Sequence, residues 1–313
     1  MCARIFFNKA LMLSAAFLLF SQGEAAPEKE SLTVFMAAAL SPAVNELRKE
    51  AGESQGLDLR PEASGSQVAC RKITELGRRC DLLMLADNFL FKELASSQCS
   101  WRIDFALDEM VLGVGIRAKR VDDAEKDWLS VVRDKQVRLA CADENLNPVG
   151  YRALMVWQLQ DPSGRLGSEL KAKAVANVED VSHLATLLKT GNADYAFLYR
   201  STCVSNDIRY IALDKKINLG AEGEDYGKAQ VRIVAGKVNP KEVLLKGSPI
   251  TMSLSVPSIA QNRDAAIKFI TWLLCDKKDI LVKNGLSPMK PKFYGTEPDY
   301  APFKGLAERA GDF

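Results

Sequence analysis

The sequence has little of what hydrolytic and metal-dependent enzymes use. Its 313 residues contain one histidine, His183, which sits in a helical pattern beside Leu184 and suits a packing or surface role. No serine, cysteine or aspartate motif pairs a nucleophile with a base, and neither a phosphate loop nor a dinucleotide fingerprint occurs. The adjacent acids Asp143 and Glu144 fit a solvated polar loop. We therefore expect neither an enzyme nor a bound cofactor.

An excess of one charge is also missing. The chain has 42 Lys and Arg against 40 Asp and Glu, a formal net charge of +2. No basic stripe or tail is present to hold nucleic acid or an anionic membrane surface. Any anion that binds must therefore be held locally, by a few placed hydrogen-bond donors.

Cysteine pairs at metal-ligand spacing are absent too. The seven cysteines include no CxxC pair and have no histidine partner, which argues against a structural metal site. An oxidising compartment would permit disulfides. The sequence leaves their pairing open among Cys70, Cys80, Cys99, Cys141, Cys203 and Cys275.

The first 25 residues have the order of a secretory signal peptide. Arg4 and Lys9 supply positive charge, an apolar stretch runs from Ala10 to Phe20, and small residues follow at 23–25. The alternative is a permanent N-terminal anchor, but the apolar stretch is much shorter than the roughly 20 residues that span a bilayer. We predict cleavage near residue 25 and a periplasmic mature protein.

Strand and helix patterns then alternate in two sets, which predicts an α/β protein with two lobes and a cleft between them. The expected lobes are 31–110 plus 254–313, and 111–253. Two strands, within 109–116 and 250–256, are expected to cross between them. The expected strands are 32–36, 57–61, 82–86, 137–142 and 194–199, and the expected helices are 42–50, 67–76, 150–159, 181–189 and 264–274. The tail after Pro288 looks loosely structured.

Small and hydroxyl residues gather where three strands lead into helices. These turns are 37–41, 64–66 and 147–150. The first N–H groups of a helix lack intrahelical partners, and the helix dipole favours negative charge there. One such turn is usually an ordinary helix cap. Three that face one cleft would form an anion site without a charged side chain.

These segments resemble the periplasmic molybdate/tungstate-binding proteins of ABC importers, particularly the branch of the archaeal tungstate receptors. The matching stretches are LTVFMAAALSPAVNELRKE, EASGSQVACRKITELGRRCDLLMLAD, NPVGYRALMVWQL, GNADYAFLYRS and GSPITMSLSVPSIAQNRDAAIKFITWLL. The resemblance implies a type II periplasmic-binding-protein fold with a two-strand hinge. It also implies a monomer that closes on a molybdate or tungstate oxyanion and delivers it to an ABC permease.

The resemblance assigns ligand-binding roles to individual residues. Ser66 matches the serine of the second loop, and Tyr199 matches a tyrosine that closes the site. Backbone N–H groups are expected from Val149 and, in the first loop, from Ala39 and Leu40.

Three positions depart from the family pattern. The first-loop serine is Ala39, a common aspartate is Asn147, and a glutamate of the archaeal branch is Leu198. Without those carboxylates, we expect an intact tetrahedral anion, no direct metal ligand, and a hydrogen bond donated by Asn147. The departures leave two alternatives: a receptor for sulfate, thiosulfate or a small carboxylate, or a sensory binding protein.

Overall fold

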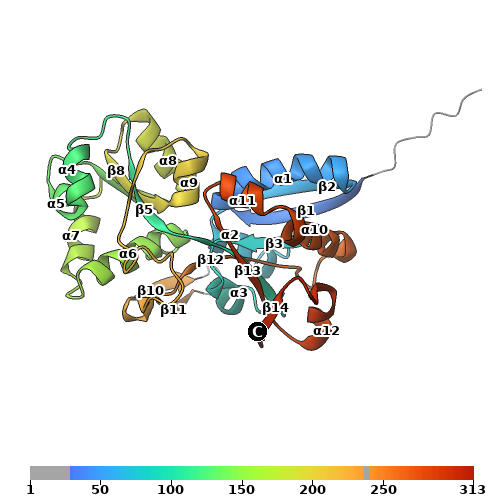
Figure 1. Ribbon diagram of the computed structural model, residues 1–313. Helices are drawn as coiled ribbons and strands as arrows, with labels where there is room; N and C mark the ends of the chain where they lie inside the picture. Colours follow the sequence, from blue (N-terminus) through green and yellow to red (C-terminus); the bar gives the residue numbers. More distant parts are fainter. Residues whose placement is uncertain (1–28, 236–239) are drawn as a thin grey trace, which may run out of the picture.

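The computed structural model describes residues 29–235 and 240–313. The predicted signal peptide lies outside these residues. Within the described ranges, no helix combines the length and the apolar content needed to cross a membrane. Two α/β units, each built on its own sheet, lie side by side in Figure 1. We call the unit that contains the first strand lobe 1 and the other lobe 2.

Lobe 1 is built on a seven-stranded sheet in the order β14-β13-β4-β12-β3-β1-β2. The strands are β1 (Glu30–Ala37), β2 (Leu57–Ser64), β3 (Leu82–Leu85), β4 (Arg102–Asp108), β12 (Ile250–Ser255), β13 (Ser287–Tyr294) and β14 (Glu308–Gly311). β1 pairs in parallel with both β2 and β3, which confirms the predicted parallel arrangement of the first three strands. β12 is antiparallel to β3 and β4.

Helices cover both faces of this sheet. They are α1 (Ser41–Ser54), α2 (Ser66–Thr74), α3 (Phe89–Leu94), α10 (Arg263–Asp276), α11 (Lys278–Lys283) and α12 (Glu297–Tyr300), with 3-10 turns at Ala38–Leu40 and Ala301–Phe303. Helix α1 buries Val44 and Leu47 on one side, with Pro42 in its first turn, where a missing N–H costs nothing. Helix α10 confirms the expected C-terminal helix that packs back onto lobe 1.

Lobe 2 is built on a five-stranded sheet in the order β7-β6-β8-β5-β9. Its strands are β5 (Met110–Val114), β6 (Leu139–Ala142), β7 (Ala176–Val178), β8 (Tyr195–Tyr199) and β9 (Tyr210–Ala212). Its helices are α4 (Val121–Lys126), α5 (Trp128–Arg133), α6 (Pro148–Gln160), α7 (Arg165–Lys173), α8 (Val181–Thr190) and α9 (Arg200–Ser205), with a 3-10 turn at Tyr226–Lys228. A hairpin of β10 (Gln230–Ala235) and β11 (Lys241–Lys246) contacts α6.

The chain crosses between the lobes at two neighbouring places. Only Glu109 separates β4 of lobe 1 from β5 of lobe 2, and the return crossing is the short segment 247–249 before β12. The carbonyls of Asn218 and Leu219 accept hydrogen bonds from Met110 (2.7 Å) and Ile250 (2.7 Å), which tie the two crossings together. As a proposal, the expected boundaries after residues 110 and 253 move to Glu109 and to 247–249, because all of β5 belongs to the second sheet and all of β12 to the first.

The C-terminal tail differs from the expectation. Residues beyond Pro288 continue strand β13, then form α12 and strand β14, which pairs with β13. Trp101, Phe293 and Phe303 pack their rings together, with centroids between 5.3 and 6.0 Å apart. The prediction of a loose tail was wrong because the apolar partners of this segment, above all Trp101, lie far away in the sequence.

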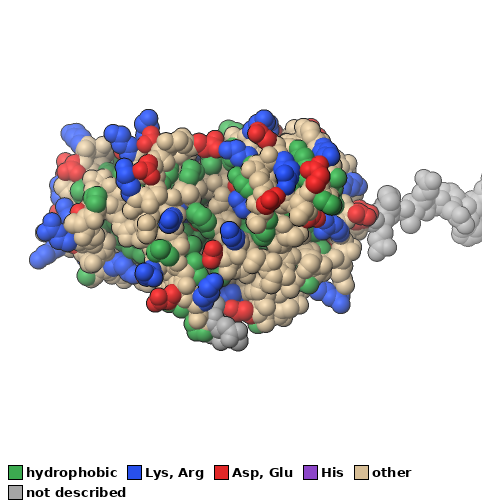
Figure 2. Space-filling model, turned by 90° about the horizontal axis from the view of Figure 1, so that it is seen from below, with side chains coloured by type: hydrophobic (Ala, Val, Ile, Leu, Met, Phe, Trp, Pro, Cys, Tyr) green, Lys and Arg blue, Asp and Glu red, His purple; other side chains and the backbone are tan. Residues whose placement is uncertain are grey.

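The surface carries no large field of one sign on the face seen in Figure 2. Basic and acidic side chains are interspersed over both lobes there, in keeping with the net charge of +2. Long-range attraction of an anion is therefore weak, and recognition depends on local groups.

Candidate functional site

A small cavity lies between the lobes, where the N-terminal ends of several helices meet. Lobe 1 supplies the 3-10 turn before α1, the start of α2 and the end of β3. Lobe 2 supplies the starts of α6 and α8 and the end of β8. The lining residues are Ala37, Ala38, Ala39, Ser64, Gly65, Ser66, Ala86, Asn147, Pro148, Val149, Val181 and Tyr199.

Five of the six residues expected at the site line this cavity. The segments that contain Ala39 and Ser66 form the lobe 1 wall, and those that contain Asn147, Val149 and Tyr199 form the lobe 2 wall. Leu40 does not line the cavity. Its side chain packs into the hydrophobic core with 1% exposed, so its position follows from core packing.

Ser66 is placed by the start of α2. It is fully buried, and its hydroxyl oxygen accepts a hydrogen bond from the backbone N–H of Ala86 at 3.2 Å. The hydroxyl is then still able to donate its own hydrogen to a ligand. Gly65, immediately before it, adopts an extended backbone with φ of −60° and ψ of 145°.

Gly65 is required by the close approach of the lobes. A Cβ at this position would lie 2.5 Å from the carbonyl oxygen of Leu146 and 3.8 Å from Nδ2 of Asn147, both in lobe 2. The first distance is far below van der Waals contact. The small residues of this turn therefore allow the two walls to meet at the cavity.

Asn147 acts as the N-cap of α6, and Pro148 occupies the first turn. Its Oδ1 accepts a hydrogen bond from the N–H of Val149 at 3.0 Å. The expected ligand donor at Val149 is thus already used by the cap in this structure. Asn147 keeps its Nδ2 as a donor, and this group donates to none of the residues that the structure describes. The Val149 N–H differs from the expectation because an asparagine N-cap accepts hydrogen bonds from the free N–H groups at the start of its helix.

Tyr199 is the least satisfied polar group of the cavity. It ends β8 with 1% of its surface exposed, and its hydroxyl has no hydrogen-bond partner among the described residues. Burial raises the pKa of this phenol well above its usual value, so it stays protonated at physiological pH. A buried hydroxyl without a partner is costly unless a ligand satisfies it.

The cavity walls carry no charged side chain, although a cation lies nearby. Lys72 donates to the hydroxyl of Ser64 at 3.1 Å and pairs with Glu62 at 2.9 Å. The described residues also contain no cluster of histidine, cysteine and carboxylate side chains that would hold a metal ion. The lining chemistry therefore consists of hydroxyl, amide and backbone groups.

The enclosed space is about 10 Å³, roughly the space of one water molecule. A larger hollow of about 360 Å³ adjoins it and shares Ala38, Ala39 and Val181. Thr202, in the first turn of α9, lines this hollow with its buried hydroxyl also unpartnered. Sequence reasoning missed Thr202, although its position three residues after Tyr199 places both on one side of the strand-to-helix turn.

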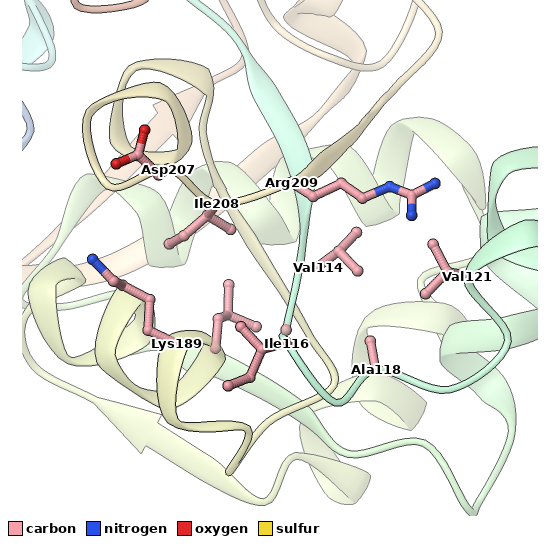
Figure 3. Close-up of a pocket in the computed structure, with 10 residues that line it drawn as sticks. Val114, Ile116, Ala118, Val121, Lys189, Asp207, Ile208 and Arg209 are labelled. Atoms are coloured by element: carbon pink, nitrogen blue, oxygen red, sulfur yellow. The ribbon is translucent and has the colours of Figure 1, made fainter.

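A separate hollow on the outer part of lobe 2, about 300 Å³, lacks the features of a ligand site. Figure 3 shows Val114, Ile116 and Ile208 inside it, whereas the charged ends of Asp207 and Arg209 point in different directions. Arg209 pairs with Glu125 at 2.6 Å. The polar groups of this hollow do not converge on one point, unlike those of the cavity between the lobes.

Comparisons with known proteins agree on one family. Residues 32–287 match the family described as bacterial extracellular solute-binding protein. An uncharacterised solute-binding protein of Petrotoga mobilis is 31% identical over 271 residues, 83% of this chain and 84% of that protein. The molybdate/tungstate-binding protein WtpA of Pyrococcus abyssi is 28% identical over 345 aligned positions, 96% of this chain and 98% of that protein.

The fold has solved relatives as well. The periplasmic molybdate-binding protein of Azotobacter vinelandii aligns with a TM-score of 0.61 and 15% identity, over 82% of this chain and 98% of that one. These relatives confirm the expected two-lobe periplasmic-binding fold, and they are solute-binding proteins rather than enzymes. The chain belongs to the bacterial extracellular solute-binding protein family.

Proposed function

We propose that this protein is a periplasmic receptor that captures molybdate or tungstate as an intact tetrahedral dianion and passes it to an ABC permease. The observation that carries the proposal is the buried, unpartnered hydroxyl of Tyr199, a residue that lines the same uncharged cavity as Ser66 and Asn147. An oxyanion would accept hydrogen bonds from all three. The name of the relative from Pyrococcus abyssi supports this choice of anion.

Hydrogen-bond donors also explain the expected selectivity. A fully deprotonated oxyanion only accepts hydrogen bonds, which suits walls that offer hydroxyl, amide and backbone N–H donors. Phosphate near neutral pH retains a proton that needs an acceptor, and the uncharged lining offers no carboxylate for it. The anion enters when the lobes separate, and the cavity around it is wider than in this structure, since the enclosed space of about 10 Å³ is smaller than such an anion.

The direct experiment is a thermal-unfolding and calorimetric comparison of molybdate, tungstate, sulfate and phosphate. A ligand that binds only the folded protein stabilises it by about 2.7 kcal/mol at 100 times its dissociation constant. We expect clear stabilisation by molybdate and tungstate and little by phosphate. Stabilisation by none of the four anions, with a response to another solute, would contradict the proposal.

A second candidate is a receptor for sulfate, thiosulfate or a small carboxylate. Ala39 favours it, because an alanine in this lining position supplies no hydroxyl. One hydrogen bond to a charged ligand is worth roughly 1.5–3 kcal/mol, which is enough to change the preferred anion. Competition calorimetry ranks these anions against molybdate.

Export and delivery are further parts of the proposal. We propose cleavage of residues 1–25, which mass measurement of the mature N-terminus would test. Delivery to a permease is distinguished from a sensory role by transport of labelled molybdate in cells with and without the gene. Uptake that does not depend on this chain would favour sensing.

A further inference from the structure

One ion pair between the lobes is completely buried. The side chains of Asp87 and Arg152 are both 0% exposed, and Nη2 of Arg152 lies 2.7 Å from Oδ2 of Asp87. The same carboxylate oxygen accepts from Nε of Arg152 at 3.1 Å and from the hydroxyl of Tyr151 at 2.5 Å. Asp87 follows β3 in lobe 1, whereas Tyr151 and Arg152 lie on α6 in lobe 2.

Arg152 also holds the segment where the chain returns to lobe 1. Its Nη1 donates to the carbonyl of Ser248 at 2.8 Å, within the crossing 247–249. One guanidinium thus connects a helix of lobe 2, a loop of lobe 1 and one of the two crossings. Its planar set of five donors allows it to serve several acceptors at once.

The ion pair lies directly beside the candidate site. Ala86, which lines the cavity, is the neighbour of Asp87, and Val149 of the cavity wall is one helical turn before Arg152. The positive charge of Arg152 lowers the pKa of the Tyr199 hydroxyl, against the larger opposite effect of burial. The relative position of Asp87 and Arg152 therefore sets how the two cavity walls face each other.

A buried ion pair is a poor means of stabilising a fold. Removing both charges from water costs about as much as their attraction returns, and apolar residues often serve equally well. In a protein whose lobes open and close, this near-cancellation of desolvation cost and attraction has another consequence. Both groups regain water when the lobes part, so the pair fixes the closed geometry without the adhesion of an apolar contact.

We propose that the Asp87–Arg152 ion pair, with Tyr151, positions the two walls of the anion site by holding the lobes closed. The proposal rests on the proposed function insofar as the ligand binds between the lobes. Loss of the arginine alone leaves a buried carboxylate that has no counter-charge and lies beside a bound dianion. The closed, liganded state carries this penalty, whereas the open state hydrates the carboxylate.

The test is the variant Arg152→Met, measured with molybdate. We expect affinity to fall about 100-fold or more, mainly through faster dissociation. Small-angle scattering of the ligand-free protein should show a larger radius of gyration than that of the wild type. Adding Asp87→Asn removes the orphan carboxylate while Oδ1 still accepts from the N–H of Phe89. This double variant should recover at least about tenfold of the lost affinity.

Arg138→Met is the matched control. Arg138 pairs with Asp194 at 2.7 Å within lobe 2, and Asp194 is likewise 0% exposed, whereas Arg138 itself is 39% exposed. This variant should lower the melting temperature and leave the molybdate dissociation rate and the radius of gyration unchanged. If Arg152→Met does not fold, Tyr151→Phe replaces it, because it removes one hydrogen bond and keeps both charges. We expect about a fivefold faster dissociation for that variant.

The outcomes separate this proposal from the proposed function. If none of the anions binds the wild type, the proposed function fails, and the scattering comparison of the ligand-free variants still decides the role of the pair. Wild-type dissociation and radius of gyration in Arg152→Met would overturn the positioning role. Equal losses of affinity in Arg152→Met and Arg138→Met would also overturn it, because both would then reflect general destabilisation.

Discussion

The cavity and the ion pair beside it are both buried between the lobes, yet they differ completely in charge. The cavity is lined only by uncharged groups, and the buried hydroxyl of Tyr199 has no partner among the described residues. One turn further along α6, Arg152 pairs with Asp87, and Tyr151 and Ser248 supply further hydrogen bonds to the two groups. The two regions therefore have different proposed roles. The unpartnered neutral donors bind the anion, and the paired charges fix the relative position of the cavity walls.

Placing a charge in the neutral cavity should have the largest effect. Asn147→Asp keeps an oxygen that can cap Val149, so α6 should persist. It replaces the Nδ2 donor by a negative charge that faces the dianion. We expect molybdate affinity to fall about 100-fold or more, since like charges in contact cost several kcal/mol. Calorimetry measures the change, and tighter binding would instead indicate direct coordination of the metal by the carboxylate.

A change of shape without a change of charge should have the next largest effect. In Gly65→Ala the new methyl group would meet the Leu146 carbonyl of lobe 2, while the φ of −60° suits alanine. The clash exists only when the lobes are closed. We expect about a tenfold or greater loss of affinity and little change in the melting temperature of the ligand-free protein. Wild-type affinity would mean that Gly65 and Leu146 lie further apart in the liganded protein than in this structure.

Removing the unpartnered hydroxyl should have an effect of similar size on affinity and none on the fold. Tyr199→Phe deletes a group that makes no hydrogen bond to the described residues. We expect a loss of roughly 1.5–3 kcal/mol in binding, about one to two decades, with equal or higher thermal stability. A lower melting temperature with unchanged affinity would show that this hydroxyl supports the fold and not the ligand.

The smallest effect on binding is expected at Asp108, next to the crossing. Burial raises the pKa of this carboxyl from 3.8 to about 7, while hydrogen bonds from Ser201 and from the Glu109 backbone and the charge of Arg200 oppose the rise. The folded protein therefore binds this proton more tightly than the unfolded chain, so stability is lost as the pH rises from about 4 to about 7. Asp108→Asn removes this loss.

Urea unfolding at about pH 4 and about pH 8 measures the difference between Asp108→Asn and the wild type. The asparagine Oδ1 can keep the two backbone hydrogen bonds, and its amide can donate to the hydroxyl of Ser201. The free energy of unfolding of the variant, relative to the wild type, should therefore increase with pH. A difference that does not change with pH would mean that Asp108 titrates normally.

Local patterns in the sequence were enough to predict much of the fold. The parallel order of the first strands and helix α10 follow from apolar periodicity. Strand β4 and the tail after Pro288 did not, since the tail strand β13 pairs with β4, and these two segments lie far apart in the sequence. The sequence did not predict that the N–H of Val149 donates to the side chain of Asn147 instead of being free for a ligand.

By itself the sequence determined the class of protein and the chemistry of its site: a two-lobe α/β chain of balanced charge, with small and hydroxyl residues before its helices. These features are local, because helix starts and apolar periodicity are properties of neighbouring residues. Only the tertiary structure decided which polar groups are left unsatisfied and which are paired. Asp87 and Arg152 lie 65 residues apart, and only the packing of one lobe on the other removes both from water and brings them together.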